Sequence, residues 1–177
     1  YAMGESYGGY RAPRIAYELQ SQIGVGVTGL IMVSPYLDPA SGDGATALSP
    51  LPWMIDLPSM AAAHLESQGR LTPEAMAEVE AYTRGPFATD LLKGRADPAA
   101  VERIVTRVTS LTGLDPALVR RLGGRVDTGT FLREVHRDDG TIGSVYDSNV
   151  TAFGPFPWSA QRQSNDPILD ALIAPTT

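Results

Sequence analysis

The first ten residues of the chain read Tyr-Ala-Met-Gly-Glu-Ser-Tyr-Gly-Gly-Tyr, and residues 4–8 match the pattern Gly-x-Ser-x-Gly. In this pattern a serine on a sharp turn between strand and helix exposes its hydroxyl, and glycines let the neighbouring backbone pass close by. The helix that follows offers unpaired N–H groups and the positive end of its dipole. The pattern therefore predicts Ser6 as a nucleophile and the backbone N–H of Tyr7 as an oxyanion donor. The alternative is an ordinary serine in a glycine-rich turn.

The residues after this stretch predict a strand–helix–strand unit. A helix is expected over residues 10–22, because apolar residues recur on one face at Ala12, Ile15, Ala16, Leu19 and Ile23. The run Val-Thr-Gly-Leu-Ile-Met-Val at 27–33 is typical of a strand buried on both faces of a parallel sheet. Ligands of such sheets bind beyond the carboxyl ends of the strands, so Ser6 and residues 34–38 are expected to share one rim. Asp38 on that rim is interpreted as a turn residue before proline rather than as a catalytic acid.

The middle of the chain predicts a loop followed by a series of helices. Residues 38–58 are rich in Pro, Gly, Ser and Ala and are expected to form a long rim loop, in which Trp53 either lines a pocket or anchors the loop. Three capping residues precede a proline at a first helical position: Thr72-Pro73, Asp97-Pro98 and Asp115-Pro116. Three glycines stand where segments end: Gly94, Gly113 and Gly123. The expected helices are 59–68, 74–84, 98–111, 131–137 and 168–173, with residues 141–151 extended.

Composition excludes several classes of function. A net charge of −6 argues against a nucleic-acid partner, because nucleic acids select basic surfaces. No apolar run is long enough to predict a membrane span. The chain has no cysteine, which excludes disulfides and thiolate metal sites and leaves the compartment open. Neither a metal-ligand spacing nor a phosphate-binding glycine loop is present in the sequence.

Residues 4–9, Gly-Glu-Ser-Tyr-Gly-Gly, resemble the nucleophile motif of the serine carboxypeptidases, a family of α/β-hydrolases. A glutamate directly before the serine is more specific than the five-residue pattern. The rest of the chain is similar to the family more loosely and looks most like its bacterial branch. The similar features are a strand ending at Ser34-Pro35, a long helical insertion, residues 131–134 and residues 146–148. The resemblance spans most of the chain, but only the first ten residues are diagnostic.

The resemblance implies that no cofactor is needed, and it implies a role for Glu5. Glu5, kept protonated by burial and by a second acid, would donate a hydrogen bond to the free α-carboxylate of a peptide substrate; a glutamate that only caps the helix is the alternative. Gly8 and Gly9 would let the helix approach the sheet. His64 lies in a predicted helix and His136 beside a turn, so both are interpreted as structural or solvated rather than as the catalytic base. The base and its acid are expected outside the chain.

The sequence therefore predicts an α/β protein: a partial α/β-hydrolase fold with an inserted helical cap. The expected segments are a core at 1–51, a cap at 52–140 and a return segment at 141–177. Because residue 1 already lies inside a predicted strand, the chain is expected to be an internal piece of a longer protein. The expected function is a serine carboxypeptidase that acts on peptides and needs the rest of its catalytic domain. An esterase or acyltransferase on the same scaffold, and an inactive binding module, stay open as alternatives.

Overall fold

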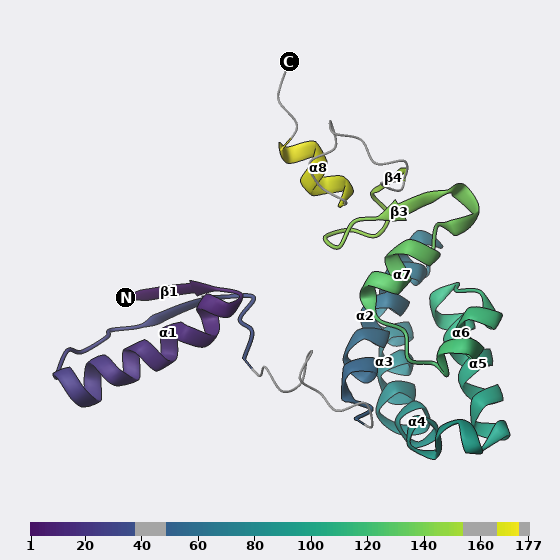
Figure 1. The fold of residues 1–177 in the computed structure, drawn as a ribbon, viewed down its shortest axis with the longest axis horizontal. Helices are drawn as coiled ribbons and strands as arrows, with labels where there is room; N and C mark the ends of the chain where they lie inside the picture. The colour runs from purple at the N-terminus through teal and green to yellow at the C-terminus, as the bar shows by residue number, and fades with distance from the viewer. Residues whose placement is uncertain (38–48, 154–165, 174–177) are drawn as a thin grey trace. The chain divides into compact units, whose positions relative to one another are not determined.

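The computed structural model describes residues 1–37, 49–153 and 166–173. The described chain mixes α and β structure, with much more helix than strand (Figure 1). It divides into two compact units, Tyr1–Ala47 and Leu48–Thr177, which we call unit 1 and unit 2. The sequence predicts three segments, at 1–51, 52–140 and 141–177.

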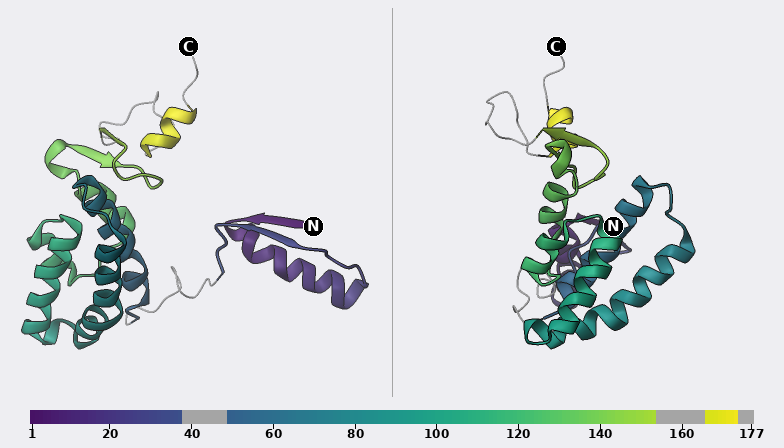
Figure 2. Two further views of the ribbon diagram at one scale, coloured as in Figure 1. Left: turned by 180° about the vertical axis from the view of Figure 1, so that it is seen from behind. Right: turned by 90° about the vertical axis from the view of Figure 1, so that its right-hand side faces the viewer.

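Unit 1 is the predicted strand–helix–strand unit. Strands β1 (Ala2–Glu5) and β2 (Leu30–Val33) pair in parallel, in a register that runs from Ala2 opposite Leu30 to Glu5 opposite Val33. Between them, α1 (Tyr7–Glu18) lies along one face of the pair, as Figures 1 and 2 show from different sides. A π-helical turn at Leu19–Ile23 extends α1 and ends at Gly24 in the left-handed conformation, as the sequence predicts.

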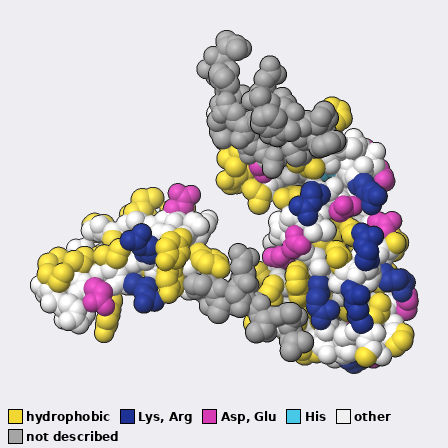
Figure 3. All heavy atoms as spheres, in the orientation of Figure 1, with side chains coloured by type: hydrophobic (Ala, Val, Ile, Leu, Met, Phe, Trp, Pro, Cys, Tyr) yellow, Lys and Arg dark blue, Asp and Glu magenta, His cyan; other side chains and the backbone are white. Residues whose placement is uncertain are grey.

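The burial predicted for unit 1 is partly wrong. Gly9, Ala12 and Ala16 are buried on α1, but Ile15 and Ile23 from the predicted apolar face are exposed. Strand β2 is shorter than predicted, and all four of its residues are exposed. The physical reason is that the sheet has two strands and one covering helix among the described residues, so it offers little surface against which a strand can be buried. Hydrophobic side chains are accordingly visible over much of unit 1 (Figure 3).

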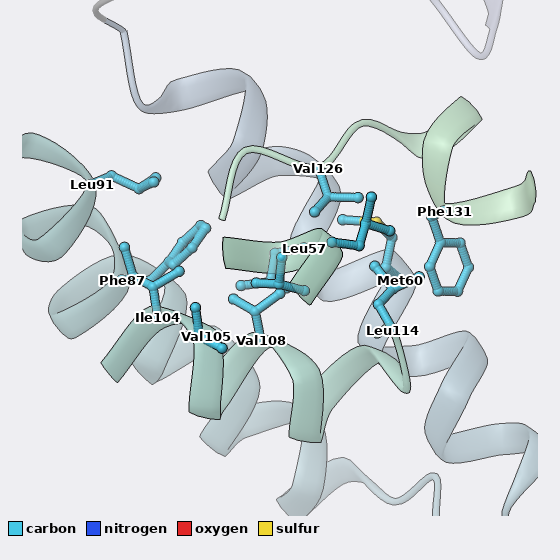
Figure 4. Packing of buried hydrophobic residues seen from close by; sticks show 12 residues of the cluster. Leu57, Met60, Phe87, Leu91, Ile104, Val105, Val108, Leu114, Val126 and Phe131 are labelled. Atoms are coloured by element: carbon cyan, nitrogen blue, oxygen red, sulfur yellow. The ribbon is translucent and has the colours of Figure 1, made fainter. Parts of the chain in front are cut away.

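In the part of unit 2 that the structure describes, six α-helices precede the hairpin. Their bounds are α2 (Leu51–Ser67), α3 (Pro73–Tyr82), α4 (Ala88–Lys93), α5 (Pro98–Thr112), α6 (Pro116–Leu122) and α7 (Thr128–Glu134). The core lies among α2, α4, α5, α6 and α7, where the buried cluster includes Leu57, Phe87, Val108, Leu114 and Phe131 (Figure 4). Helix α5 supplies the predicted apolar stripe, with Ile104, Val105, Val108 and Leu111 buried and Val101 half-buried. Within the described residues, no helix combines the length and the apolar character that crossing a membrane would require.

The predicted helix boundaries in unit 2 are largely confirmed. Thr72, Asp97 and Asp115 each accept a hydrogen bond from a backbone N–H three residues on, over 3.1, 3.0 and 2.9 Å. A proline follows each of them at the start of α3, α5 and α6. The predicted terminal glycines adopt positive φ at 68°, 72° and 63° for Gly94, Gly113 and Gly123. These ends form from local chemistry, which is why the sequence predicts them well.

Two element predictions are wrong. The sequence predicts a loop over residues 51–58, yet α2 begins at Leu51. Pro52 stands in the first turn, where a missing N–H costs nothing, and Pro58 lies within the helix. Burial of Leu57, Met60, Ala61 and Leu65 stabilises this helix in spite of its prolines. The helix predicted at 131–137 begins at Thr128 instead, because Asp127 caps it by accepting from the N–H of Thr130 over 2.7 Å.

The end of unit 2 is a short hairpin followed by a helix. Strands β3 (Thr141–Gly143) and β4 (Thr151–Phe153) pair antiparallel, which gives the predicted extended segment a definite form. Helix α8 (Pro167–Ile173) follows, with Asp166 before it. The carboxylate of Asp166 accepts hydrogen bonds from the N–H of Val145 over 2.7 Å and from Oγ of Ser144 over 2.9 Å. Asp166 thereby ties the start of α8 to the segment after β3.

Candidate active site

Ser6 occupies the junction between β1 and α1 with a strained backbone. Its dihedral angles are φ 52° and ψ −118°, a combination that suits glycine at the first central position of a type II′ turn. Only one other non-glycine residue among those described has positive φ. Such strain costs about 1–3 kcal/mol and persists only where surrounding contacts hold it.

Backbone hydrogen bonds hold Ser6 in place. Its N–H donates to the carbonyl of Val33 over 3.0 Å, and its own carbonyl accepts from the N–H groups of Gly9 and Tyr36, each over 3.0 Å. The residue is therefore fixed both to its own helix and to the segment that follows β2. Its side chain makes no hydrogen bond that caps α1, and the residue is exposed.

The glycines of the motif differ in their roles. A Cβ on Gly4 would overlap the carbonyl group of Gly8 and come within 2.7 Å of the nitrogen of Gly9. A Cβ on Gly9 would come within 2.6 Å of Cβ of Pro35. Gly4 and Gly9 are therefore required by close approach, as predicted for Gly9. The prediction for Gly8 is wrong, because a Cβ there would meet open space.

Ser34 is the second strained residue, and the sequence gives no sign of it. Its φ is 42°, and it follows β2 directly, just as Ser6 follows β1. Because the two strands are parallel and paired, the two serines lie at the same edge of the sheet. Ser6 and Ser34, both strained, therefore lie together at the carboxyl ends of the strands, where the sequence predicts a shared rim. Asp38, which the sequence also assigns to this rim, lies outside the described residues.

Tyr7 and Glu5 flank the nucleophile. Tyr7 is the first residue of α1, where the N–H has no partner within the helix, so its position suits the predicted oxyanion donor. Its ring is exposed and stacks on Tyr10 with 5.7 Å between ring centres. Glu5 is exposed at the end of β1. The burial that its predicted role in carboxylate recognition requires is therefore not supplied by the described part of the chain.

A polar and aromatic surface that the sequence analysis missed continues from Tyr7 along α1. A shallow groove of about 370 Å³ is lined there by Tyr7, Tyr10, Arg11, Arg14 and Ile15. Arg14 donates to the hydroxyl of Tyr10 over 2.7 Å, and its guanidinium lies 5.2 Å from the centre of that ring. The signal in the sequence is helical spacing, since residues 7, 10, 11 and 14 share one face.

Both histidines have partners within unit 2. His64 lies in α2, and its Nε2 is 2.8 Å from the side-chain amide nitrogen of Gln68. Its ring also packs on Gly113, where an added Cβ would lie 2.7 Å from Nδ1. Burial lowers the pKa of His64, and the charge of Arg70 lowers it further by a smaller amount. His136 donates from Nε2 to the carbonyl of Ser148 over 2.7 Å. Each imidazole thus has a structural contact, and His136 is half-buried rather than freely solvated.

The residues described include no group of three or more His, Asp or Glu side chains that would hold a metal ion. No protein-family model matches the chain, and searches of curated proteins and of solved structures also found no match.

Proposed function

We propose that Ser6 is the nucleophile of an acyl-transfer reaction on an α/β-hydrolase scaffold, and that the protein is a serine carboxypeptidase. The observation that carries the proposal is the backbone of Ser6, with φ 52° and ψ −118° between a parallel strand and the first turn of a helix. Backbone strain of this kind clusters at active sites, where it fixes a reactive group in position. The required glycines at positions 4 and 9 and the exposed hydroxyl support the same assignment.

The reaction divides into two steps. Oγ of Ser6 attacks the carbonyl carbon of the last peptide bond, and its proton passes through a general base to the leaving amine. The N–H of Tyr7 donates to the oxyanion of the tetrahedral intermediate. Water then hydrolyses the ester on Ser6 and releases the shortened peptide. We assign the base to neither His64 nor His136, because each imidazole is already held by a contact in unit 2; the rest of the catalytic domain would supply it.

The nucleophile is tested by covalent trapping in the full-length protein. A fluorophosphonate probe should form a bond between phosphorus and Oγ of Ser6 and release fluoride, and peptide mapping by mass spectrometry should locate the added mass on residues 1–10. Ser6→Ala should abolish this labelling. Ser34→Ala is the matched control, because it removes a hydroxyl from the other strained serine of the same rim. Equal labelling of wild type and Ser6→Ala would refute the nucleophile.

The substrate class needs a separate measurement. For a carboxypeptidase, kcat/KM should be much higher for a peptide with a free C-terminal carboxylate than for the same peptide amidated. Glu5→Ala should remove this preference, whereas Glu5→Gln, which keeps a donor, should retain most of it. Labelling of Ser6 without any preference for the free acid would point instead to an esterase or acyltransferase. Absence of labelling together with peptide binding would favour the inactive binding module.

A further inference from the structure

A cleft of about 490 Å³ opens in unit 2 and is lined by residues of that unit. One wall is a face of α2, and the opposite wall is a face of α7 formed by Thr128, Phe131 and Leu132. The segment Ser144–Ser148 after β3 closes a third side. On the α2 side, three of the lining residues have short side chains: Ser59, Ala62 and Ala63. Its volume is in the range of sites that bind small molecules.

The apolar lining of the cleft is held by the core of unit 2. Met60 and Phe131 line it and also belong to the buried core of unit 2, where they are 3% and 2% exposed. In Figure 4 these two residues lie at the end of the core cluster opposite Leu91. Ser144 is fully buried, and its Oγ donates to Asp166, so this side of the cleft is fixed by the same carboxylate that begins α8. The walls are therefore preformed.

The charges that line the cleft have one sign. Among the described residues that line it, only Glu66 and Asp147 are charged, and both are exposed. Arg70 and Arg133 are adjacent in sequence to lining residues but do not line the cleft. Arg70 donates a hydrogen bond to Gln68 over 3.0 Å, and Arg133 donates one to Thr130 over 3.4 Å. The ring of Tyr146, which is 67% exposed, belongs to the same lining and offers a π face to a cation.

Two further carboxylates strengthen the negative potential near Thr128. Asp56 on α2 is half-buried and accepts hydrogen bonds from Thr128, which lines the cleft. Burial raises the pKa of Asp56, and the charge of Asp127 raises it further, which shows that the two acids lie close enough to interact. Carboxylates therefore lie near the α7 side of the cleft as well, where Asp127 also interacts with Arg133.

We propose that this cleft binds an organic cation carried on an apolar stem, either a free alkylamine or the side chain of a lysine or arginine in a peptide. The methylenes of the stem would pack on Met60, Phe131 and Leu132, and the charged head would lie between Glu66 and Asp147. This division of a site into an apolar body and a charged rim matches the way long cationic side chains are bound. The inference does not depend on the reaction at Ser6.

The test is calorimetric titration of the full chain with hexylammonium, with hexanol and hexanoate as ligands of similar stem but different charge. Hexylammonium should bind at least about tenfold more tightly than either, and its affinity should fall as salt rises. Glu66→Gln and Asp147→Asn should each weaken binding by about 1.5- to 5-fold, the range expected for one solvated ion pair. In the wild type, Asp147 accepts a hydrogen bond from the N–H of Asn149 over 3.0 Å, and Asp147→Asn keeps a side-chain oxygen that can accept it. Glu74→Gln on α3, outside the cleft, is the control and should change nothing.

A second series separates the two sources of the cation. A pentapeptide with a central lysine and its counterpart with norleucine are titrated beside the free amine. Tighter binding of the lysine peptide than of hexylammonium, lost with norleucine, identifies a peptide ligand, whereas equal or tighter binding of the free amine identifies a small molecule. Equal affinity for hexanol and hexylammonium, no binding of any cation, or full affinity in both acidic variants would overturn the proposal.

Discussion

Arg103 on α5 makes a bidentate ion pair with Asp90 on α4: Nη2 donates to Oδ1 over 2.6 Å, and Nε donates to Oδ2 over 2.9 Å. The Asp90 side chain is 5% exposed, and Lys93 adds a weaker contact at 3.5 Å. The hydrogen bonds from Arg103 lower the pKa of Asp90 although burial opposes this shift. Two helices of unit 2 are therefore joined by a buried carboxylate that stays ionised.

This pair predicts acid sensitivity. Because the pKa of Asp90 is lower in the folded than in the unfolded state, its stabilising contribution is complete above about pH 4 and is lost as pH falls through the folded value. Asp90→Asn should lower the free energy of unfolding at pH 7 by about 1–2 kcal/mol, a discounted figure because half of the Arg103 side chain is solvated. The gap between wild type and Asp90→Asn in urea unfolding should narrow below pH 4. Glu80→Gln, which removes an exposed ion pair with Arg84, is the control and should have little effect at either pH.

Two adjacent leucines offer a test of the core. Leu91 is 2% exposed and belongs to the buried cluster of unit 2, whereas Leu92 is 69% exposed. Leu91→Ala should destabilise unit 2 by about 2–5 kcal/mol, because it removes buried methyl groups and leaves a cavity. Leu92→Ala should stay within about 0.5 kcal/mol of wild type. Chemical unfolding followed by circular dichroism measures both; similar losses in the two variants would contradict this packing of α4.

The glycines of the elbow predict opposite results for two formally similar changes. Gly4→Ala should disrupt unit 1, because its Cβ would overlap the carbonyl group of Gly8. Gly8→Ala should leave unit 1 intact, because a Cβ there meets open space. Amide hydrogen exchange of peptides from residues 1–37 reports on this unit separately, and protection should fall only in Gly4→Ala. Faster exchange in both variants would mean that the turn has another geometry.

Tyr82 carries a buried hydroxyl without a hydrogen-bond partner in the described structure. Burial and, after it, the charge of Asp90 raise the pKa of Tyr82 to about 12. The unfolded side chain ionises near pH 10, so wild-type stability should fall between about pH 10 and 12, where the unfolded state has already lost the proton. Tyr82→Phe should be as stable as wild type at pH 7, because no hydrogen bond is lost, and should be more stable than wild type in that alkaline window. A loss of more than about 1 kcal/mol at pH 7 would reveal a partner for the hydroxyl.

The sequence predicts best those features that depend on neighbouring residues. The caps at Thr72, Asp97 and Asp115 are of this kind, as is the turn at Ser6, because each follows from one side chain and the backbone beside it. The prolines and small residues at 51–58 predict a loop, but the burial of Leu57 favours a helix there.

Features that depend on contacts between distant segments could not be predicted from the sequence. The exposure of β2 depends on how many strands pair with it, and a run of apolar residues does not encode that number. The strain at Ser34 and the cleft between α2 and α7 arise where distant segments meet. The structure also places the motif residues together, but this tests nothing, because Glu5, Ser6 and Tyr7 are adjacent in the chain. The chemical roles assigned to them stay predictions.

The exposed strand β2 has a consequence for handling the protein. Leu30, Ile31, Met32 and Val33 are between 38% and 51% exposed in a two-stranded sheet, so backbone groups at its outer edges have no strand to pair with among the described residues. Short apolar strands with free edges recruit further strands from other molecules. Solutions of this chain should therefore become turbid through aggregation above a threshold concentration. That threshold should fall on warming and should rise in the Ile31→Lys variant, which places a charge in the middle of the strand.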